Sequence, residues 1–92
     1  HQQSLLHIAS YINNKNIVNY LLQQENINLD SKDEDGKTPL FYAILSNNNS
    51  IAIKLIKNGA NINAMDNMGM TPIFYAVFSK NIEIINTLIR EA

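Results

Sequence analysis

A segment that occurs twice, 33 residues apart, constrains the fold of this chain more than any other feature. Residues 38–43 read Thr-Pro-Leu-Phe-Tyr-Ala, and residues 71–76 read Thr-Pro-Ile-Phe-Tyr-Ala. A more divergent copy, Ser-Leu-Leu-His-Ile-Ala, stands at residues 4–9, which is 34 residues before the first of these. Self-similarity of this period is typical of stacked arrays, in which a small unit buries its apolar face only against its neighbours. Such an array presents an extended surface rather than a pocket with catalytic groups.

Each copy predicts two short helices separated by a tight turn. In the middle copy, residues 33–37 have turn chemistry, and Gly36 is suited to a positive φ. Thr38 can cap a helix with its hydroxyl and Pro39 fits the first helical position, so a first helix is expected over 39–46. A second helix follows after a polar turn, and its apolar face consists of Ile51, Ala52, Leu55 and Ile56.

Stacking would align equivalent apolar residues of the copies in three rows. Helices of this length are marginal alone, so packing along the rows must supply most of the stability. The alanine row matters because small side chains let the first helices of neighbouring units approach closely. The rows are Leu6, Leu40 and Ile73; Ala9, Ala43 and Ala76; and Leu21, Leu55 and Leu88.

The order of these residues resembles the ankyrin repeat. The resemblance is carried by the Asp–Gly turn, Thr-Pro-Leu with its following Ala, a Leu-Ile pair and a closing segment, here residues 33–43, 55–56 and 58–63. It implies an all-α fold, a solenoid of stacked helix-turn-helix units joined by hairpin-like loops, with a concave binding face. A single domain over 1–92 is expected, and we interpret it as a piece of a longer array. Its units are expected at about residues 1–32 (partial), 33–65 and 66–92 (partial).

Two departures from the ankyrin pattern predict where the copies differ. The histidine of the pattern survives only as His7, which is expected to hydrogen-bond in the capping motif beside Ser4. Phe41 and Phe74 take its place in the other copies, which must rely on apolar packing instead. The glycine of the tight turn between the two helices is absent. Of the residues that replace it, Asn tolerates a left-handed conformation better than Lys does. The residues that replace it are Asn13, Asn47 and Lys80.

Composition excludes several classes of partner. The net charge is −1, so no basic field attracts nucleic acid or anionic lipid. The longest apolar runs, such as Ile73–Phe78, are far shorter than the ~20 residues of a membrane span, and no membrane insertion is expected. The chain has no cysteine, which fits a reducing compartment and leads us to expect an intracellular, cytoplasmic location.

No group of residues predicts catalysis or cofactor binding. Residues 31–36 resemble the start of a calcium loop, but Ser31 and Tyr42 stand where acidic ligands are required. We therefore interpret the three carboxylates there as a solvated hairpin tip. His1 and His7 have no cysteine or clustered acid with which to bind a metal. We expect no enzymatic activity, no metal and no cofactor.

The resemblance to ankyrin repeats assigns partner binding to the hairpin tips and to the ends of the first helices. Tyr11, Leu45 and Phe78 occupy equivalent places and would form an apolar stripe; the alternative is that they lean inward and cover the helix packing. Tyr42 and Tyr75 are expected in or partly in the core. The predicted partner-binding residues are Tyr11, Ile12, Glu34, Asp35, Lys37, Leu45, Ser46, Asn67, Met68, Met70, Phe78 and Ser79.

The function predicted from these features is a protein–protein interaction module with an unknown protein partner. The alternative is a structural spacer or a regulatory segment of a larger multidomain protein whose activity lies outside this chain. The last helix has no following unit to cover it, so fraying or self-association is expected there. Its apolar residues are Ile84, Ile85, Leu88 and Ile89.

Overall fold

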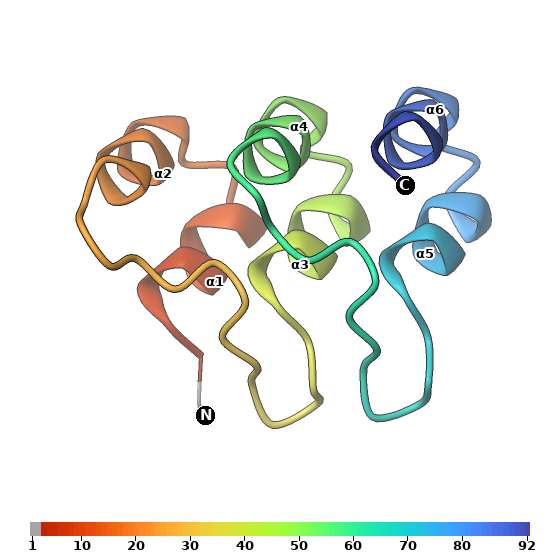
Figure 1. Ribbon diagram of the computed structural model, residues 1–92, viewed down its shortest axis with the longest axis horizontal. Coiled ribbons are helices and arrows are strands. Elements are labelled where there is room, and N and C mark those ends of the chain that lie inside the picture. Colours follow the sequence, from red (N-terminus) through yellow and green to blue (C-terminus); the bar gives the residue numbers. More distant parts are fainter. Residues whose placement is uncertain (1–2) are drawn as a thin grey trace.

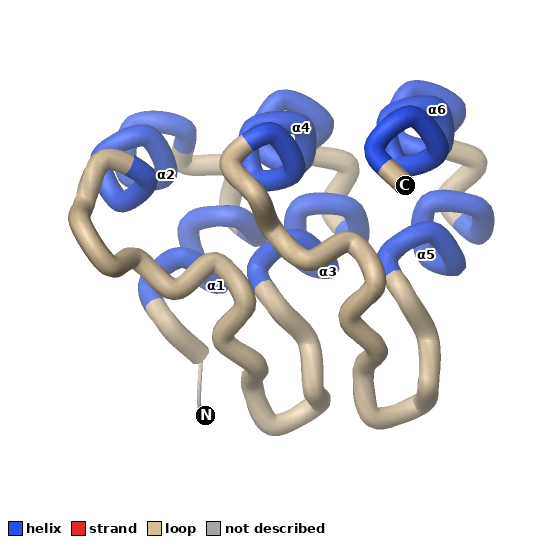
Figure 2. Tube along the Cα trace, viewed as in Figure 1, coloured by secondary structure: helices blue, strands red, loops and turns tan. Residues whose placement is uncertain are grey.

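The computed structural model describes residues 3–92, and within them all regular structure is helical, which confirms the all-α prediction (Figure 2). His1, which was considered above as a metal ligand, lies outside the described residues. The predicted first helix of the middle copy ends one residue earlier than expected. The helices are α1 (Leu5–Tyr11), α2 (Lys15–Leu22), α3 (Pro39–Leu45), α4 (Asn49–Lys57), α5 (Pro72–Phe78) and α6 (Ile82–Glu91).

The helices form two layers, and the loops between units project from one of them (Figure 1). The first layer consists of α1, α3 and α5, with α1 packed on α3 and α3 packed on α5. The second layer consists of α2, α4 and α6, each packed on the preceding helix of its own unit. We name the pairs α1–α2, α3–α4 and α5–α6 units 1, 2 and 3. The hairpin loops that join the units reach beyond the first layer and lie side by side (Figure 1).

The predicted rows of apolar residues form the core. Leu40, Ala43 and Leu55 of unit 2 are fully buried, because this unit has a neighbour on both sides. Leu21 and Ile73 are only partly buried, since they belong to the units at the two ends of the described stack. The three alanines of the first layer are all buried, which permits the close packing of α1, α3 and α5.

The tight turn within each unit contains one residue in the left-handed conformation, at the predicted positions. Asn13, Asn47 and Lys80 have φ values of 63°, 58° and 56°. A side chain other than glycine costs roughly 1–2 kcal/mol in this conformation, and Asn reduces that cost by local hydrogen bonding. Lys80 therefore carries the most backbone strain of the three.

The prediction that Thr38 caps its helix through the hydroxyl is wrong. Thr38 is the N-cap residue of α3, but its hydroxyl makes no capping bond, and Oγ1 is buried without a hydrogen-bond partner among the described residues. At the equivalent position of α1, Ser4 Oγ accepts from the His7 amide at 3.3 Å, and His7 Nδ1 accepts from the Ser4 amide at 3.0 Å. The reciprocal bond of this capping box needs the imidazole, and the apolar ring of Phe41 stands in its place in unit 2.

Asparagines at the starts of the second helices have two different roles. Asn14 and Asn81 cap α2 and α6, since Oδ1 of each accepts from a backbone amide in the first turn. Asn48 makes no such cap, because its Nδ2 instead donates to the carbonyl oxygen of Ser10 at 2.7 Å. This bond ties the turn of unit 2 to the end of α1 in unit 1.

The exposure of the apolar residues of α6 differs from the prediction. Ile84 and Leu88 are 0% and 3% exposed, so the expectation that they lack a covering neighbour is wrong for these two residues. They face the preceding unit, where α6 packs on α4. Ile85 is partly buried, whereas Ile89 stays exposed as predicted. Phe74, Val77 and Ile82 are further exposed apolar side chains of this unit.

Candidate protein-binding surface

The predicted stripe at the ends of the first helices is exposed. Tyr11, Leu45 and Phe78 are 58%, 40% and 68% exposed, and they occupy the last residue of α1, α3 and α5. The alternative, in which these side chains fold inward over the helix packing, does not describe this structure. Three large apolar side chains therefore line one edge of the first layer.

A second row runs parallel to this stripe, three residues earlier on the same helix faces. It consists of Ile8, which is exposed, and of Tyr42 and Tyr75, which are half-buried as predicted. The two rows touch through edge-on aromatic contacts, with centroid distances of 6.2 Å for Tyr11–Tyr42 and 6.5 Å for Tyr75–Phe78. Between units 1 and 2 the rows enclose a cleft lined by Gln3, Ile8, Tyr11 and Tyr42.

In each hairpin, one buried aspartate accepts hydrogen bonds from the backbone amides of the turn. Asp33 is only 9% exposed, so the prediction of a solvated tip is wrong for this residue. Its Oδ1 accepts from the amides of Asp35 and Lys37 at 3.0 Å and 2.9 Å, and its Oδ2 accepts from the hydroxyl of Tyr42. Of the three carboxylates at this tip, only those of Glu34 and Asp35 remain exposed.

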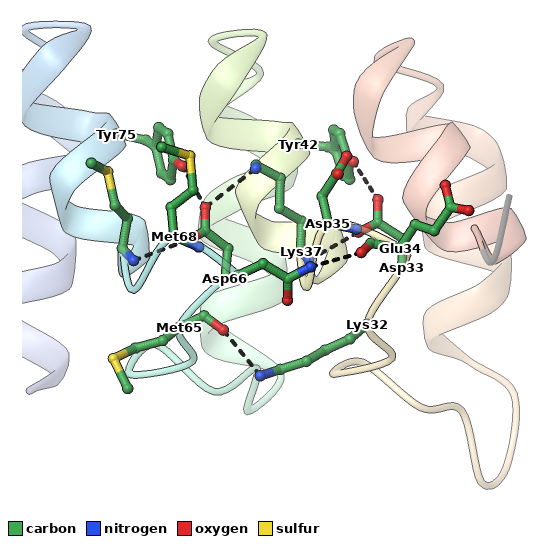
Figure 3. Close-up of polar contacts among 12 residues, drawn as sticks. Lys32, Asp33, Glu34, Asp35, Lys37, Tyr42, Met65, Asp66, Met68 and Tyr75 are labelled. Atoms are coloured by element: carbon green, nitrogen blue, oxygen red, sulfur yellow. Dashed lines mark hydrogen bonds and ion pairs between the residues drawn. The ribbon is translucent and has the colours of Figure 1, made fainter.

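The next hairpin repeats this arrangement. Asp66 Oδ1 accepts from the amides of Met68 and Met70 at 2.9 Å and 3.0 Å, and Oδ2 accepts from the hydroxyl of Tyr75 (Figure 3). Sequence reasoning missed both aspartate–tyrosine pairs. The signal was present, because Asp33 and Tyr42 recur as Asp66 and Tyr75 with the same spacing.

These bonds perturb the acidity of both partners. Burial raises the pKa of Asp66, but hydrogen bonds from Tyr75, the Met70 amide and Lys37 outweigh burial and lower the pKa to about 2. The pKa of Asp33 is lowered in the same way, by bonds that outweigh its burial. Burial and the bond to Asp33 raise the pKa of Tyr42 to about 12. The pairs are thus carboxylates held by neutral phenols throughout the physiological pH range.

Lys37, which was predicted to contact a partner protein, forms an ion pair with Asp66 of the next hairpin instead. Its Nζ lies 3.2 Å from Asp66 Oδ2, where the two side chains are 16% and 0% exposed, and 5.4 Å from the ring centroid of Tyr75 (Figure 3). Burial lowers the pKa of Lys37, but the bond to Asp66 and the nearby phenol outweigh it, and the net shift is upward. This cation joins unit 2 to unit 3.

Other polar tip residues also join the hairpins. The Asn67 amide donates to the Asp35 carbonyl oxygen at 3.0 Å, and Asn67 Nδ2 donates to that of Glu34 at 2.7 Å. Lys32 Nζ donates to the Met65 carbonyl oxygen at 3.0 Å (Figure 3). The neighbouring hairpins are therefore one connected surface.

Comparison with known proteins agrees with this geometry. A family model for ankyrin repeats, in three copies, matches residues 6–92. The chain belongs to the ankyrin-repeat family. No curated protein matches the chain closely enough to count as a relative. Ankyrin repeats are in general protein–protein interaction modules, and members of the family are typically not enzymes.

The remaining predicted contact residues of this ankyrin stack differ in their availability. Ile12, Met68 and Ser79 are exposed, whereas Met70 is partly buried. Ser46 is half-buried, and its Oγ donates to the Tyr42 carbonyl oxygen at 2.5 Å. Their role in partner binding stays a prediction.

Within residues 3–92, no three His, Asp or Glu side chains converge as a metal site would require. Over the same residues, the ankyrin helices are all too short or too polar to traverse a lipid bilayer. His7, the imidazole that these residues contain, has a structural role. Its Nδ1 accepts from the Ser4 amide, so the proton is on Nε2, which donates to the Lys37 carbonyl oxygen at 2.8 Å.

Proposed function

We propose that this ankyrin stack binds a partner protein through the face formed by the ends of α1, α3 and α5 and by the hairpin tips. The observation that carries the proposal is the exposed stripe of Tyr11, Leu45 and Phe78. Contiguous exposed apolar side chains mark interaction sites, and aromatic residues are enriched at the centres of interfaces. The stripe is continuous with the row of Ile8, Tyr42 and Tyr75, so a partner could bury both rows together.

The chemistry of the stack also favours binding over catalysis. Asp33 and Asp66 accept hydrogen bonds from their own hairpins, and His7 bonds to backbone on both ring nitrogens. A general base or nucleophile needs a lone pair directed at a substrate. We therefore propose that the chain itself is not an enzyme and that it acts by binding, in an intracellular, cytoplasmic setting.

The test compares two triple variants that remove similar apolar area from different faces. The first carries Tyr11→Ala, Leu45→Ala and Phe78→Ala. The control carries Tyr20→Ala, Ile82→Ala and Ile89→Ala, whose side chains are 63%, 65% and 60% exposed on the second layer. Proteins retained by the immobilised wild-type chain are identified, and the best-retained one is purified and titrated against each variant by calorimetry.

The stripe variant should lose at least about tenfold in affinity, because central aromatic contacts contribute about 1–2 kcal/mol or more each. The control should bind like the wild type, and both variants should keep their far-ultraviolet circular dichroism. Equal binding by the stripe variant, or loss of binding in the control alone, would place the contact elsewhere.

A spacer makes a different prediction from a binding module. Deleting residues 38–70 in frame removes one repeat period and merges two hairpins, so a spacer would keep every contact made outside the stack. The binding module would lose the central residue of its stripe, Leu45, and with it the partner.

We also propose that the exposed apolar end formed by Phe74, Val77, Ile82 and Ile89 supports weak self-association. Sedimentation velocity over a range of concentrations measures this directly. A profile that does not change with concentration would contradict it.

A further inference from the structure

The two aspartate–tyrosine pairs differ in one respect: one of them binds a cation. At the joint of units 2 and 3, Lys37 Nζ lies 3.2 Å from Asp66 Oδ2 and 5.4 Å from the ring centroid of Tyr75. At the joint of units 1 and 2, Asp33 and Tyr42 are paired in the same way. The protein thus shows, in its own second joint, that a carboxylate and a tyrosine ring placed like this accommodate an ammonium group.

The residue that corresponds to Lys37 in unit 1 is Gln3. It precedes Ser4 as Lys37 precedes Thr38, and its side chain contacts Oδ2 of the next aspartate, as that of Lys37 does. Gln3 Nε2 donates to Asp33 Oδ2 at 3.4 Å, near the long limit of a hydrogen bond, and the residue is exposed. An uncharged amide therefore stands where the next joint has a cation, and solvent can reach it.

Asp33 is buried, but its two side-chain partners line an open cleft. Gln3 and Tyr42 both donate to Asp33 Oδ2, and both line the cleft together with Ile8 and Tyr11. The exposed carboxylate of Asp35 lies on the same hairpin as Asp33, and its charge adds to burial in raising the pKa of Tyr42. The two lysines of this hairpin are directed to the other joint, since Lys37 binds Asp66 and Lys32 donates to the Met65 carbonyl oxygen (Figure 3). Among residues 3–92, the first joint thus combines aromatic rings, an accessible cleft and net negative charge.

We propose that this cleft is a subsite for an arginine or lysine side chain of the partner, which binds Asp33 and Tyr42 as Lys37 binds Asp66 and Tyr75. The inference rests on the proposed binding surface, since the cleft forms the unit 1 end of the two apolar rows. A guanidinium suits the site best, because it can donate to Oδ2 of Asp33 while its plane lies against the ring of Tyr42, as the Lys37 ammonium lies over the ring of Tyr75. The partner would then present a basic residue followed by apolar residues along the stripe.

The test uses a small probe, so it does not require the partner. N-acetyl-arginine amide is titrated into the isotope-labelled chain, and the ring signals of Tyr11 and Tyr42 are followed by nuclear magnetic resonance. N-acetyl-citrulline amide is the matched control ligand, because it has the same shape without the charge. The arginine probe should give saturable shifts at these rings with a dissociation constant on the order of 10 mM, and citrulline should give none.

Two variants make the test specific. Gln3→Lys should place the chain's own ammonium on Asp33 and weaken the arginine probe at least about tenfold, with the fold unchanged. Lys37→Gln should create a second responsive site at Tyr75. The fold of the Lys37→Gln variant is checked by circular dichroism. If this variant is unfolded, the comparison of Gln3→Lys with the wild type is sufficient to test the subsite.

The inference is overturned if the wild type shows no saturable shift at Tyr42, or if Gln3→Lys responds like the wild type. Failure of the proposed function has a different signature. In that case the arginine probe still binds the cleft, but the stripe variant with Tyr11, Leu45 and Phe78 replaced by alanine retains its partner.

Discussion

Gly36 and Gly69 permit a matched test of how closely neighbouring hairpins approach. Both have a φ of +78° in equivalent hairpins, so alanine at either position adopts the same unfavourable backbone conformation. They differ in their surroundings. A Cβ at Gly36 would lie 2.4 Å from Asn67 Oδ1 and 2.8 Å from the Asn67 backbone nitrogen, whereas a Cβ at Gly69 would have no atom within 4 Å.

The magnitude follows from these contacts. Gly69→Ala should destabilise the protein by roughly 1–2 kcal/mol, the cost of a side chain in the left-handed region. Gly36→Ala has this cost and must also displace backbone at Asn67, which breaks the bonds from Asn67 to the carbonyls of Asp35 and Glu34. At about 1 kcal/mol for each bond, Gly36→Ala should be about 2 kcal/mol less stable than Gly69→Ala.

Urea denaturation followed by far-ultraviolet circular dichroism measures both free energies of unfolding, with equal slopes required for the comparison. The double variant Gly36→Ala with Asn67→Ala provides a control, since it removes the obstructing Oδ1 but leaves the backbone nitrogen. It should recover only part of the loss. If the two single variants agree within about 0.5 kcal/mol, the hairpins do not approach as closely as described.

Three further predictions concern single side chains. Because the folded pKa of Asp66, about 2, is lower than its ordinary value of 3.8, its stabilisation is complete above about pH 4 and is lost as the pH falls through about 2. The stability difference between wild type and Asp66→Asn should therefore shrink by about 2 kcal/mol over that range, and a difference independent of pH would contradict the assignment. Lys80→Asn should raise the free energy of unfolding by about 0.5–1 kcal/mol, and Asn47→Lys should lower it similarly, because both residues have left-handed backbones. Thr38→Val should leave stability unchanged or raise it by up to about 1 kcal/mol, since the buried Oγ1 has no partner. Ser4→Ala, its control, should lose about 1 kcal/mol with the capping bond, and a comparable loss in Thr38→Val would show that its hydroxyl is hydrogen-bonded.

The helical units could be predicted from the sequence because their signals are local. Pro39 restricts its own backbone, Gly36 permits a positive φ, and the apolar spacing of α4 follows from the helical period, so these features do not depend on the neighbouring unit. The left-handed residues Asn47 and Lys80 could be located for the same reason, since the repeat places them in the same turn.

The polar contacts between units could not be predicted in this way. The hydroxyl of Thr38 has the right chemistry for a cap, but the Phe41 amide that it would cap donates to the Thr38 carbonyl oxygen instead. Lys37 was expected to face a partner, yet it binds Asp66, which is distant in sequence and close only after the units stack. The pairing of Asp33 with Tyr42 depends on how the hairpin folds back against its own helix.

The joints between the units are built from different chemistry, and this limits how the units can be rearranged. His7 joins unit 1 to the Lys37 carbonyl oxygen, whereas Phe41 meets the ring of Tyr75 edge-on at 5.7 Å. If units 1 and 2 exchanged places, the imidazole and the phenyl ring would each face the residues that pack against the other. The units of this stack are therefore not interchangeable.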